Sequence, residues 1–275
     1  MKKSILITGS TDGIGKLAAL KLAKAGHHVY IHGRIRQKVD NTILEISDLS
    51  NNKDIEGFVA DFSNLIEVDK MADEILERVS QLDVLINNAG VFKSSQSHKN
   101  NGFDLRFAVN YLSPYHLTER LLPSIQNSDN PRIINLSSAA QSAVSLEALS
   151  GDLPISVQEA YAQSKLALTM WSFDLAHRLK NIVVIAVNPG SLLNTRMVQE
   201  AYGTSWSSAD KGRDILYDLA TEKEYNSASG KYFDNDKGDP KGSFGKAHAD
   251  AYNWDKIDEL RMTTKALIGE ALKQA

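Results

Sequence analysis

The chain of 275 residues contains no cysteine. Disulfide bonds, cysteine nucleophiles and thiolate metal sites are therefore excluded, and the composition fits a reducing compartment. No stretch approaches the roughly 20 apolar residues that a membrane-spanning helix needs. The apolar run near the N-terminus is too short for the core of a signal peptide. From these absences we expect a cytoplasmic protein without a membrane span.

An excess of positive charge is also lacking. Lysine and arginine number 31 against 34 acidic residues, which gives a net charge of −3. Without a basic footprint, no nucleic-acid partner is expected. The seven histidines show no compact ligand spacing, so no metal site is predicted. The length suits one large α/β domain, and we predict a single domain over residues 1–275.

Short apolar runs alternate with longer helical patterns along most of the chain. Strands are predicted at 4–8, 28–32, 55–60, 84–86, 132–136 and 182–187, and helices at 13–25, 65–79, 103–122, 158–179 and 254–273. Such alternation is typical of a doubly wound parallel sheet with helices on both faces. Pro114 predicts a kink in the third helix. The polar stretch at 234–248 predicts a loop.

A glycine-rich loop, "TGSTDGIG", lies between the first predicted strand and the first helix. Glycine tolerates unusual backbone angles and lets the chain approach a ligand closely. The helix that follows presents free N–H groups and the positive end of its dipole, which suits a pyrophosphate. In this strand–loop–helix context the pattern predicts a dinucleotide site.

The end of the second predicted strand indicates which dinucleotide is bound. A carboxylate there binds the ribose 2′-hydroxyl of NAD, whereas an arginine accommodates the 2′-phosphate of NADP. Gly33 and Arg34 stand at this point, Arg36 and Lys38 follow, and the first acidic residue is Asp40. A cationic fork matches the geometry of a phosphate. The sequence therefore favours NADP(H) over NAD(H).

Tyr161 and Lys165 are four residues apart on a predicted helix, so their side chains share one face. A nearby ammonium favours the phenolate, as a proton donor or acceptor that works near neutral pH requires. An isolated pair at this spacing is most often ordinary helix surface, so the other motifs decide its meaning.

Together the motifs resemble the short-chain dehydrogenase/reductase family, classical type, from Ile5 to about Phe233. They stand in the family's order: "TGSTDGIG", "NNAG" at 87–90, Asn110, "INLSS" ending at Ser138, "YAQSK", and "NPG" at 188–190. The resemblance implies a single-domain Rossmann fold with about seven strands. It also implies a reaction in which a hydride passes between a nicotinamide and a carbonyl or alcohol.

The resemblance also assigns roles. Asn110, Ser138, Tyr161 and Lys165 would be the catalytic tetrad, with Tyr161 as acid and base and Ser137 as a structural neighbour. Asn110 would hold a water that links Lys165 to solvent. Asp61 would contact the adenine ring, and residues 87–90 would line the cleft. The implied cofactor site comprises Gly9, Ser10, Thr11, Gly13, Ile14, Gly15, Arg34, Asp61, Phe62, Asn88, Ala89, Gly90, Tyr161, Lys165, Pro189, Gly190 and Thr195.

Two segments differ from the common pattern. Ser138 and Tyr161 are 23 positions apart, which indicates an insertion at 139–160. With "SGKYFDND" at 229–236, this looks most like the retinol dehydrogenase and carbonyl reductase branch. The insertion should lie near the mouth of the site or against the helices through which relatives pair, so both monomer and homo-oligomer stay open. We predict a substrate-binding lid around 191–228, because its first part, 191–208, carries Leu192, Leu193, Met197, Val198, Tyr202 and Trp206. A helix packed on the core is the alternative interpretation of this segment.

The leading hypothesis is an NADPH-dependent carbonyl reductase, or the alcohol dehydrogenase running in reverse, with a small and largely apolar substrate. Retinoid, steroid, aliphatic aldehyde and quinone all remain open. An epimerase or dehydratase of the extended relatives would have a G-x-x-G-x-x-G loop and a larger C-terminal substrate domain. This chain shows neither feature. A catalytically silent NADP(H) sensor tends to lose the tyrosine or lysine, and both are present here.

Overall fold

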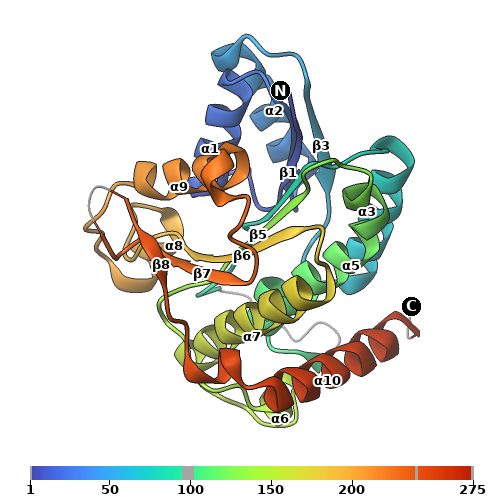
Figure 1. Ribbon diagram of the computed structural model, residues 1–275, viewed down its shortest axis with the longest axis vertical. Helices are drawn as coiled ribbons and strands as arrows, with labels where there is room; N and C mark the ends of the chain where they lie inside the picture. Colours follow the sequence, from blue (N-terminus) through green and yellow to red (C-terminus); the bar gives the residue numbers. More distant parts are fainter. Residues whose placement is uncertain (1, 95–101, 239–240, 274–275) are drawn as a thin grey trace.

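One sheet of eight strands forms the centre of the computed structural model, which describes residues 2–94, 102–238 and 241–273 (Figure 1). The strands are β1 (Ser4–Ile7), β2 (His28–Gly33), β3 (Ile55–Val59), β4 (Val84–Asn87), β5 (Arg132–Leu136), β6 (Val183–Asn188), β7 (Lys231–Asp234) and β8 (Ser243–Gly245). Their order is β3-β2-β1-β4-β5-β6-β7-β8. Neighbours pair in parallel except β7 with β8. The predicted parallel sheet is confirmed, with β8 as an antiparallel addition.

Helices cover both faces of the sheet. One face carries α1 (Gly13–Lys24), α2 (Arg36–Ser50) and α9 (Ala209–Thr221), and the other carries α3 (Leu65–Arg78), α5 (Ser113–Gln126) and α7 (Val157–Arg178). Along β1, Ile5 and Ile7 pack on the first face and Leu6 on the second, and all three are fully buried. Strands buried on both faces read as continuous apolar runs, which is why the sequence pattern located them.

Helix α2 was not predicted from the sequence. It buries only a narrow stripe formed by Val39, Thr42 and Ile46, while Leu44 on its outer side is 70% exposed. Its N-cap residue, Ile35, gives no side-chain hydrogen bond. Both usual signals of a helix, a clear apolar face and a polar N-cap, are therefore weak here.

The predicted helix with an internal proline is built from three segments. Helix α4 (Leu105–Phe107) passes into a π-helical turn, η2 (Ala108–Leu112), and then into α5. Pro114 has no N–H, so the carbonyl of Asn110, four residues earlier, lacks its usual α-helical donor. The π-helical turn lies directly before Pro114, with the Ser113 amide bonded to the Ala108 carbonyl, and such turns occur often at functional sites.

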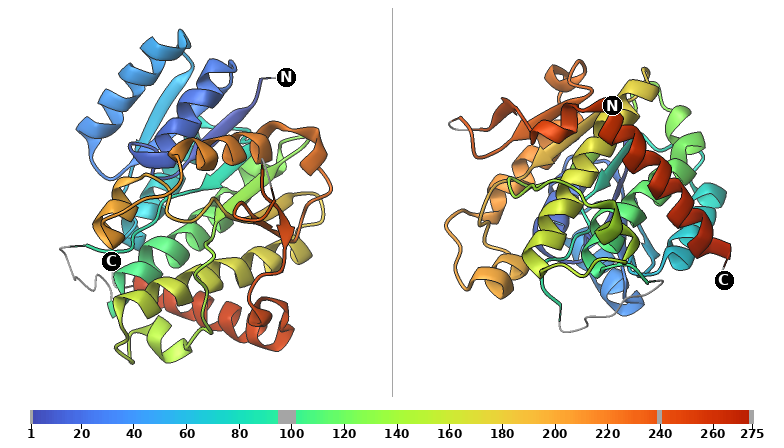
Figure 2. Two further views of the ribbon diagram at one scale, coloured as in Figure 1. Left: turned by 90° about the vertical axis from the view of Figure 1, so that its left-hand side faces the viewer. Right: turned by 90° about the horizontal axis from the view of Figure 1, so that it is seen from below.

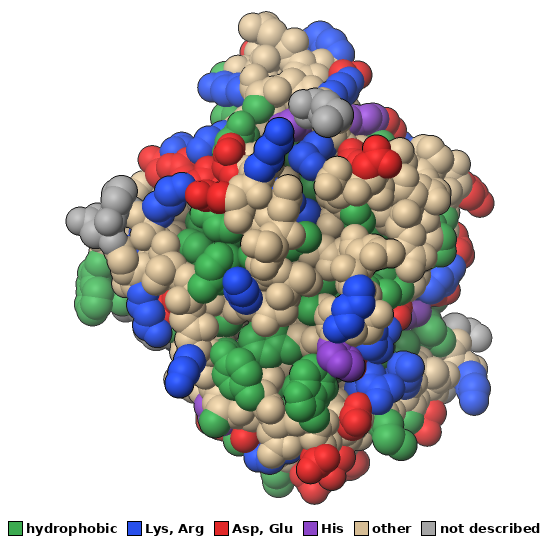
Figure 3. All heavy atoms as spheres, in the orientation of Figure 1, with side chains coloured by type: hydrophobic (Ala, Val, Ile, Leu, Met, Phe, Trp, Pro, Cys, Tyr) green, Lys and Arg blue, Asp and Glu red, His purple; other side chains and the backbone are tan. Residues whose placement is uncertain are grey.

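The C-terminal part adds an edge strand and a long helix. The predicted loop at 234–248 is wrong in part, because Ser243–Gly245 form β8 beside β7. After the short 3-10 helix η4 (Ala249–Tyr252), α10 (Trp254–Lys273) packs against α7 and α3 (Figures 1 and 2). Figure 3 shows hydrophobic side chains gathered over α7 on one face of the molecule. Tyr252 packs on Phe173 of that helix, and Trp254 packs on His177.

The insertion at 139–160 contains a short helix, α6 (Leu146–Ser150), and is tied to the start of α7. Ser142 Oγ donates to Glu159 Oε1 at 2.8 Å, and the Ser145 amide donates to Gln163 Oε1 at 2.9 Å. The insertion therefore lies beside the turn of α7 that carries Tyr161. In the described part of the chain, no helix is both long and apolar enough to cross a membrane.

Candidate active site and cofactor cleft

A cavity of about 910 Å³ opens at the carboxyl ends of the parallel strands. In doubly wound folds this is the usual place for a ligand. Most of the predicted site residues line it: Gly9, Thr11, Gly13, Ile14, Gly15, Arg34, Asp61, Phe62, Asn88, Ala89, Gly90, Ser138, Tyr161, Lys165, Pro189, Gly190 and Thr195. Ser10 and Asn110 do not line it. The chain thus brings residues from seven separate segments to one cleft.

The glycine loop lies directly on the "NNAG" segment. Gly9 has a φ of +63°, and a Cβ atom there would lie 2.8 Å from the Cα of Ala89. A Cβ at Gly15 would lie 2.4 Å from Asn88 Nδ2, which donates to the carbonyl of Gly9 at 2.9 Å. Only glycine fits these two positions, and the close packing leaves the other side of the loop open to the cavity.

The start of α1 can receive an anion. Asp12 caps the helix by accepting from the Gly13 amide at 2.7 Å, and the Lys16 amide is the first to reach a backbone carbonyl of the helix. The amides of Ile14 and Gly15 between them have no acceptor in the helix. These two N–H groups and the helix dipole fit a phosphate group.

Two predicted residues serve the scaffold instead of lining the cleft. Ser10 is fully buried, where its hydroxyl donates to the Ile7 carbonyl at 2.8 Å and accepts from the His32 amide at 3.0 Å. Asn87, which was also expected in the cleft, turns away from it. Its amide donates to Asn135 Oδ1 at 2.8 Å inside the core. Both side chains hold neighbouring strands at the edge of the site.

His32 is a site residue that the sequence interpretation missed. Its Nδ1 accepts from the Gly9 amide at 3.0 Å, and its Nε2 lies 3.1 Å from the Ala60 carbonyl. The ring therefore must be neutral with its proton on Nε2. Burial lowers the pKa of His32 to about 4. The available signal was a second histidine near the end of a strand with an apolar middle.

We expect His32→Asn to destabilise the fold, with a cost that depends on pH. His32 becomes protonated below about pH 6.5 in the unfolded chain, but only below about pH 4 in the folded protein. The wild type therefore loses up to about 3 kcal/mol between these values, a loss the variant lacks. Urea unfolding at pH 7, 5.5 and 4.5 should show the difference between the two proteins shrinking as pH falls. A difference that stays constant would contradict this assignment.

Tyr161 and Lys165 face the cavity from α7. The Nζ atom of Lys165 lies 5.7 Å from the centre of the Tyr161 ring and donates to the Leu136 carbonyl at 2.7 Å. Burial lowers the pKa of Lys165 to about 8. The Tyr161 ring is half-buried and meets Phe92 edge-on, with ring centres 4.8 Å apart. The predicted pair is thus held in one place by α7, the end of β5 and Phe92.

The two serines after β5 have different surroundings. Ser137 is 3% exposed, and its hydroxyl lies 2.6 Å from Thr169 Oγ1 and 3.1 Å from the Lys165 carbonyl. Ser138 is half-buried, lines the cavity, and accepts from the Ala140 amide at 3.1 Å. Both serines line the cavity, but the Ser137 hydroxyl is engaged by Thr169 and Lys165, and Ser138 is the more exposed of the two.

Asn110 stands behind the cavity wall. Its Oδ1 accepts from the Val91 amide at 2.7 Å, and its Nδ2 donates to the Val91 carbonyl at 3.1 Å and to Ser164 Oγ at 3.0 Å. The amide group thereby joins the π-helical turn to the segment after β4 and to α7. Pro114 has no N–H, so the Asn110 backbone carbonyl lacks its usual α-helical donor.

The far end of the cleft is cationic. Arg34 and Lys38 line it, and among the described residues neither has a carboxylate within 4 Å, whereas Arg36 pairs with Asp40 at 3.6 Å. A Cβ at Gly33 would lie 2.6 Å from the Thr11 methyl carbon. A carboxylate side chain at the end of β2 would therefore have to displace Thr11.

Asp61 and Phe62 form the adjoining wall. Phe62 is 4% exposed and stacks on His32 with ring centres 4.3 Å apart. Asp61 is partly exposed, and its Oδ1 accepts from the Ser63 amide at 2.9 Å. Both residues lie where they were predicted, beside the cavity after β3.

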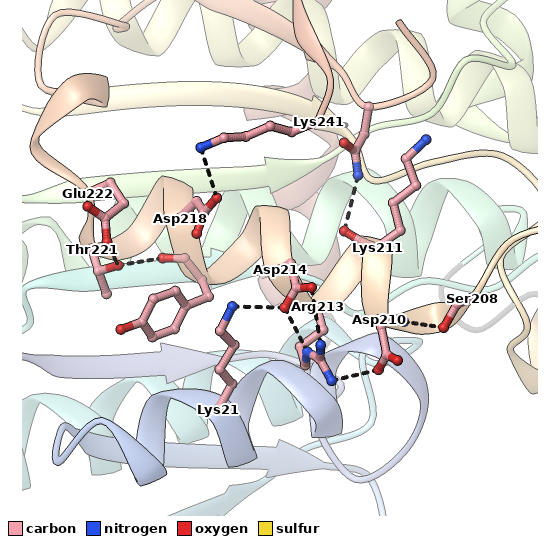
Figure 4. A network of polar contacts seen from close by, with 12 residues as sticks. Lys21, Ser208, Asp210, Lys211, Arg213, Asp214, Asp218, Thr221, Glu222 and Lys241 are labelled. Carbon is pink, nitrogen blue, oxygen red and sulfur yellow. Dashed lines mark hydrogen bonds and ion pairs between the residues drawn. The ribbon is translucent and has the colours of Figure 1, made fainter. Parts of the chain in front are cut away.

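The predicted lid at 191–228 divides into two parts. Helix α8 (Arg196–Tyr202) borders the cavity, with Leu193, Met197 and Val198 in its lining. The later part belongs to the scaffold, because α9 packs on α1, where Lys21 donates to Asp214 at 2.8 Å (Figure 4), and the 3-10 helix η3 (Lys223–Tyr225) follows it. Trp206 is 79% exposed and Leu192 is absent from the lining, while the Tyr202 side chain lies outside the described set.

Comparison with known proteins places the chain in a family. Residues 3–205 match the family model described as short chain dehydrogenase. Retinol dehydrogenase 13 of Mus musculus is 31% identical over 84% of this chain and 75% of its own length. Retinol dehydrogenase 12 of Bos taurus is 32% identical over 86% of this chain and 78% of its own length.

A solved structure agrees with these relatives. A Shigella flexneri chain described as a short chain dehydrogenase, complexed with NADP, is 26% identical and covers 84% of this chain and 96% of its own, with a TM-score of 0.68. The resemblance noted in the sequence motifs is thereby confirmed. The chain belongs to the short-chain dehydrogenase/reductase family of nicotinamide-dependent oxidoreductases, in the branch of the retinol dehydrogenases.

Proposed function

We propose that the protein is an NADP(H)-dependent reductase or dehydrogenase that acts on an apolar carbonyl or alcohol. One observation carries this proposal. One cavity holds Tyr161, Lys165 and Ser138 at one end and, at the other, Arg34 and Lys38, which have no carboxylate partner among the described residues. A dinucleotide that spans the cleft would therefore present its reactive ring to the tyrosine and its 2′-phosphate to the cations.

The residues of the cleft fit such a cofactor. The glycine loop and the open amides of Ile14 and Gly15 suit the pyrophosphate. Asp61 and Phe62 would border the adenine, and Pro189 with Gly190 would border the other ring. When bound, the nicotinamide supplies or accepts the hydride.

The side chains would move and stabilise the proton and the developing charge. In reduction, the Tyr161 hydroxyl gives its proton to the substrate oxygen, and in oxidation the phenolate takes it back. The ammonium of Lys165, 5.7 Å from the ring centre, favours the phenolate. Ser138 Oγ donates to the substrate oxygen as negative charge builds on it. The Asn110 carbonyl would hold a water beside Lys165, through which the proton is replaced from solvent.

The walls near Tyr161 support an apolar substrate. Phe92, Leu105, Val109 and Met197 line this part of the cavity. Apolar walls with few polar groups at one end are typical of a site that orients a mainly hydrophobic ligand by its single polar group. The named function of the retinol dehydrogenase relatives agrees with this chemistry. Closure of α8 over the substrate stays a prediction.

Replacing Arg34 by alanine should weaken NADPH binding about tenfold or more, because the 2′-phosphate loses a charge-assisted partner. Binding of NADH should change less than about twofold. Arg36→Ala is the matched control, since Arg36 does not line the cavity and already pairs with Asp40. Fluorescence titration with both cofactors measures the effect. Equal weakening of both by Arg34→Ala would argue against a 2′-phosphate site at this position.

The proposed reaction is tested by following NADPH absorbance, with NADH in parallel, against aldehydes, ketones, quinones and retinal. We expect consumption with an apolar carbonyl class, faster with NADPH. Tight NADPH binding without consumption of NADPH by any class would favour a cofactor sensor instead. Absence of both binding and consumption would overturn the proposal.

A further inference from the structure

Asn235, directly after β7, is buried and bonds to three separate segments. It is 1% exposed, and its Nδ2 donates to the Pro189 carbonyl at 2.8 Å and to the Lys211 carbonyl at 3.2 Å. Its Oδ1 accepts from the Gly242 amide at 3.1 Å. A buried amide group with all these partners satisfied fixes their mutual positions.

The two flanking aspartates extend the same contact. Asp236 accepts from the Ser191 amide at 2.9 Å, from Ser191 Oγ at 2.5 Å and from Asn188 Nδ2 at 2.9 Å. Asp234 Oδ1 also accepts from Asn188 Nδ2 at 2.9 Å, and the Asn235 amide donates to the Asn188 carbonyl at 3.1 Å. We call residues 234–236 the clasp. It bonds to Asn188, Pro189 and Ser191 along the segment that follows β6.

The residue that follows this segment, Leu192, has a backbone conformation that neighbouring contacts must stabilise. Leu192 has a φ of +49°, a left-handed conformation that is unfavourable for a residue with a Cβ atom. It persists only where the surroundings hold it. Asp236 holds the preceding residue, and the Leu192 carbonyl accepts from the Trp206 amide at 3.0 Å. The turn that leads into α8 is therefore fixed from both sides.

We propose that Asn235 and Asp236 are positioning residues for the nicotinamide end of the cleft. By bonding residues 188–191 they keep Pro189 and Gly190, which line the cavity, in a preset wall, and they set the point from which α8 begins. A preset wall lets a ring bind without first ordering the loop. This inference rests on the proposed nicotinamide cofactor.

The first test uses Asp236→Asn, because Asp236 is exposed and the change is isosteric. An amide nitrogen in place of one carboxylate oxygen opposes the donors Asn188 Nδ2 and Ser191 Oγ. We expect NADPH binding to weaken about fivefold. In free energy this is less than the typical contribution of one hydrogen bond to a charged group. Binding of 2′,5′-ADP, which has no nicotinamide, should change less than about twofold. Asp210→Asn is the matched control, with the same charge change on α9, where the Asp210 carboxylate pairs with Arg213; among the described residues it has no hydrogen bond or ion pair with residues 188–191.

Hydrogen exchange in the cofactor-free protein gives a second readout. The amide of Ser191 should exchange faster in Asp236→Asn than in the wild type, and at the wild-type rate in Asp210→Asn. Asn235→Ser, a stronger change, should enlarge the exchange effect. Unchanged exchange in Asp236→Asn would overturn the clasp, and so would parallel weakening of NADPH and 2′,5′-ADP. A wild type that binds neither ligand would overturn the proposed function while the exchange test still decides the clasp.

Discussion

The Tyr161→Phe variant should lose turnover by a factor of roughly 10² to 10⁴, the contribution typical of a positioned acid–base group. The change removes one hydroxyl and keeps the ring, so the edge-on contact with Phe92 at 4.8 Å is preserved. The folded structure and the cofactor cleft should therefore remain intact. NADPH binding should change less than about twofold. Steady-state rates with the substrate class found in the screen, together with a cofactor titration, measure both quantities.

Tyr115→Phe offers a matched control for this experiment. Tyr115 lies in the core on α5, is 4% exposed, and its hydroxyl has no hydrogen-bond partner among the described residues. Removing that hydroxyl should leave turnover unchanged and should not lower stability, since no bond is lost. If Tyr161→Phe kept full turnover, the proton would have to come from another group. Equal losses in both variants would indicate a general effect on packing.

Lys165→Met should abolish most turnover and alter stability in a pH-dependent way. Burial lowers the pKa of Lys165 from 10.5 to about 8, so holding the charged form in the folded protein costs up to about 3 kcal/mol below pH 8. Methionine removes this cost but leaves the Leu136 carbonyl without its donor, a loss of about 1–3 kcal/mol. The two effects oppose each other at pH 7.

The pH dependence separates them. Between pH 8 and pH 10.5 the folded protein has released the proton while the unfolded chain still binds it, so the wild type gains stability as pH rises. The variant has no such gain. The stability of Lys165→Met relative to the wild type should therefore fall by up to about 3 kcal/mol across this window. Lys180→Met, at an exposed position after α7, should show a constant difference in urea unfolding. A constant difference for Lys165→Met would mean that the ammonium is solvated.

The order of most elements and most residues of the candidate site were readable from the sequence because both rest on local patterns. Continuous apolar runs predicted the parallel strands β1 to β6, and the glycine loop predicted the start of α1. The spacing of Tyr161 and Lys165 on one helix face needed only the helical period. The family resemblance added Ser138 and Asn110 by position alone. Helices α2 and α9 and strands β7 and β8 were missed. For α2 and β8 the local signals are weak, and their stability comes from packing at the edges of the sheet.

The tertiary structure alone decided how residues from distant parts of the chain meet. The neutral ring of His32 joins the glycine loop to the segment after β3, Thr11 fills the space beside Gly33, and Asn235 holds Pro189 from 46 positions away. It also distinguished Ser137, whose hydroxyl is bonded to Thr169, from the more exposed Ser138, although both line the cavity. No periodic pattern in the sequence predicts these contacts. Each one depends on which strand ends the sheet brings side by side and on the direction in which each side chain points.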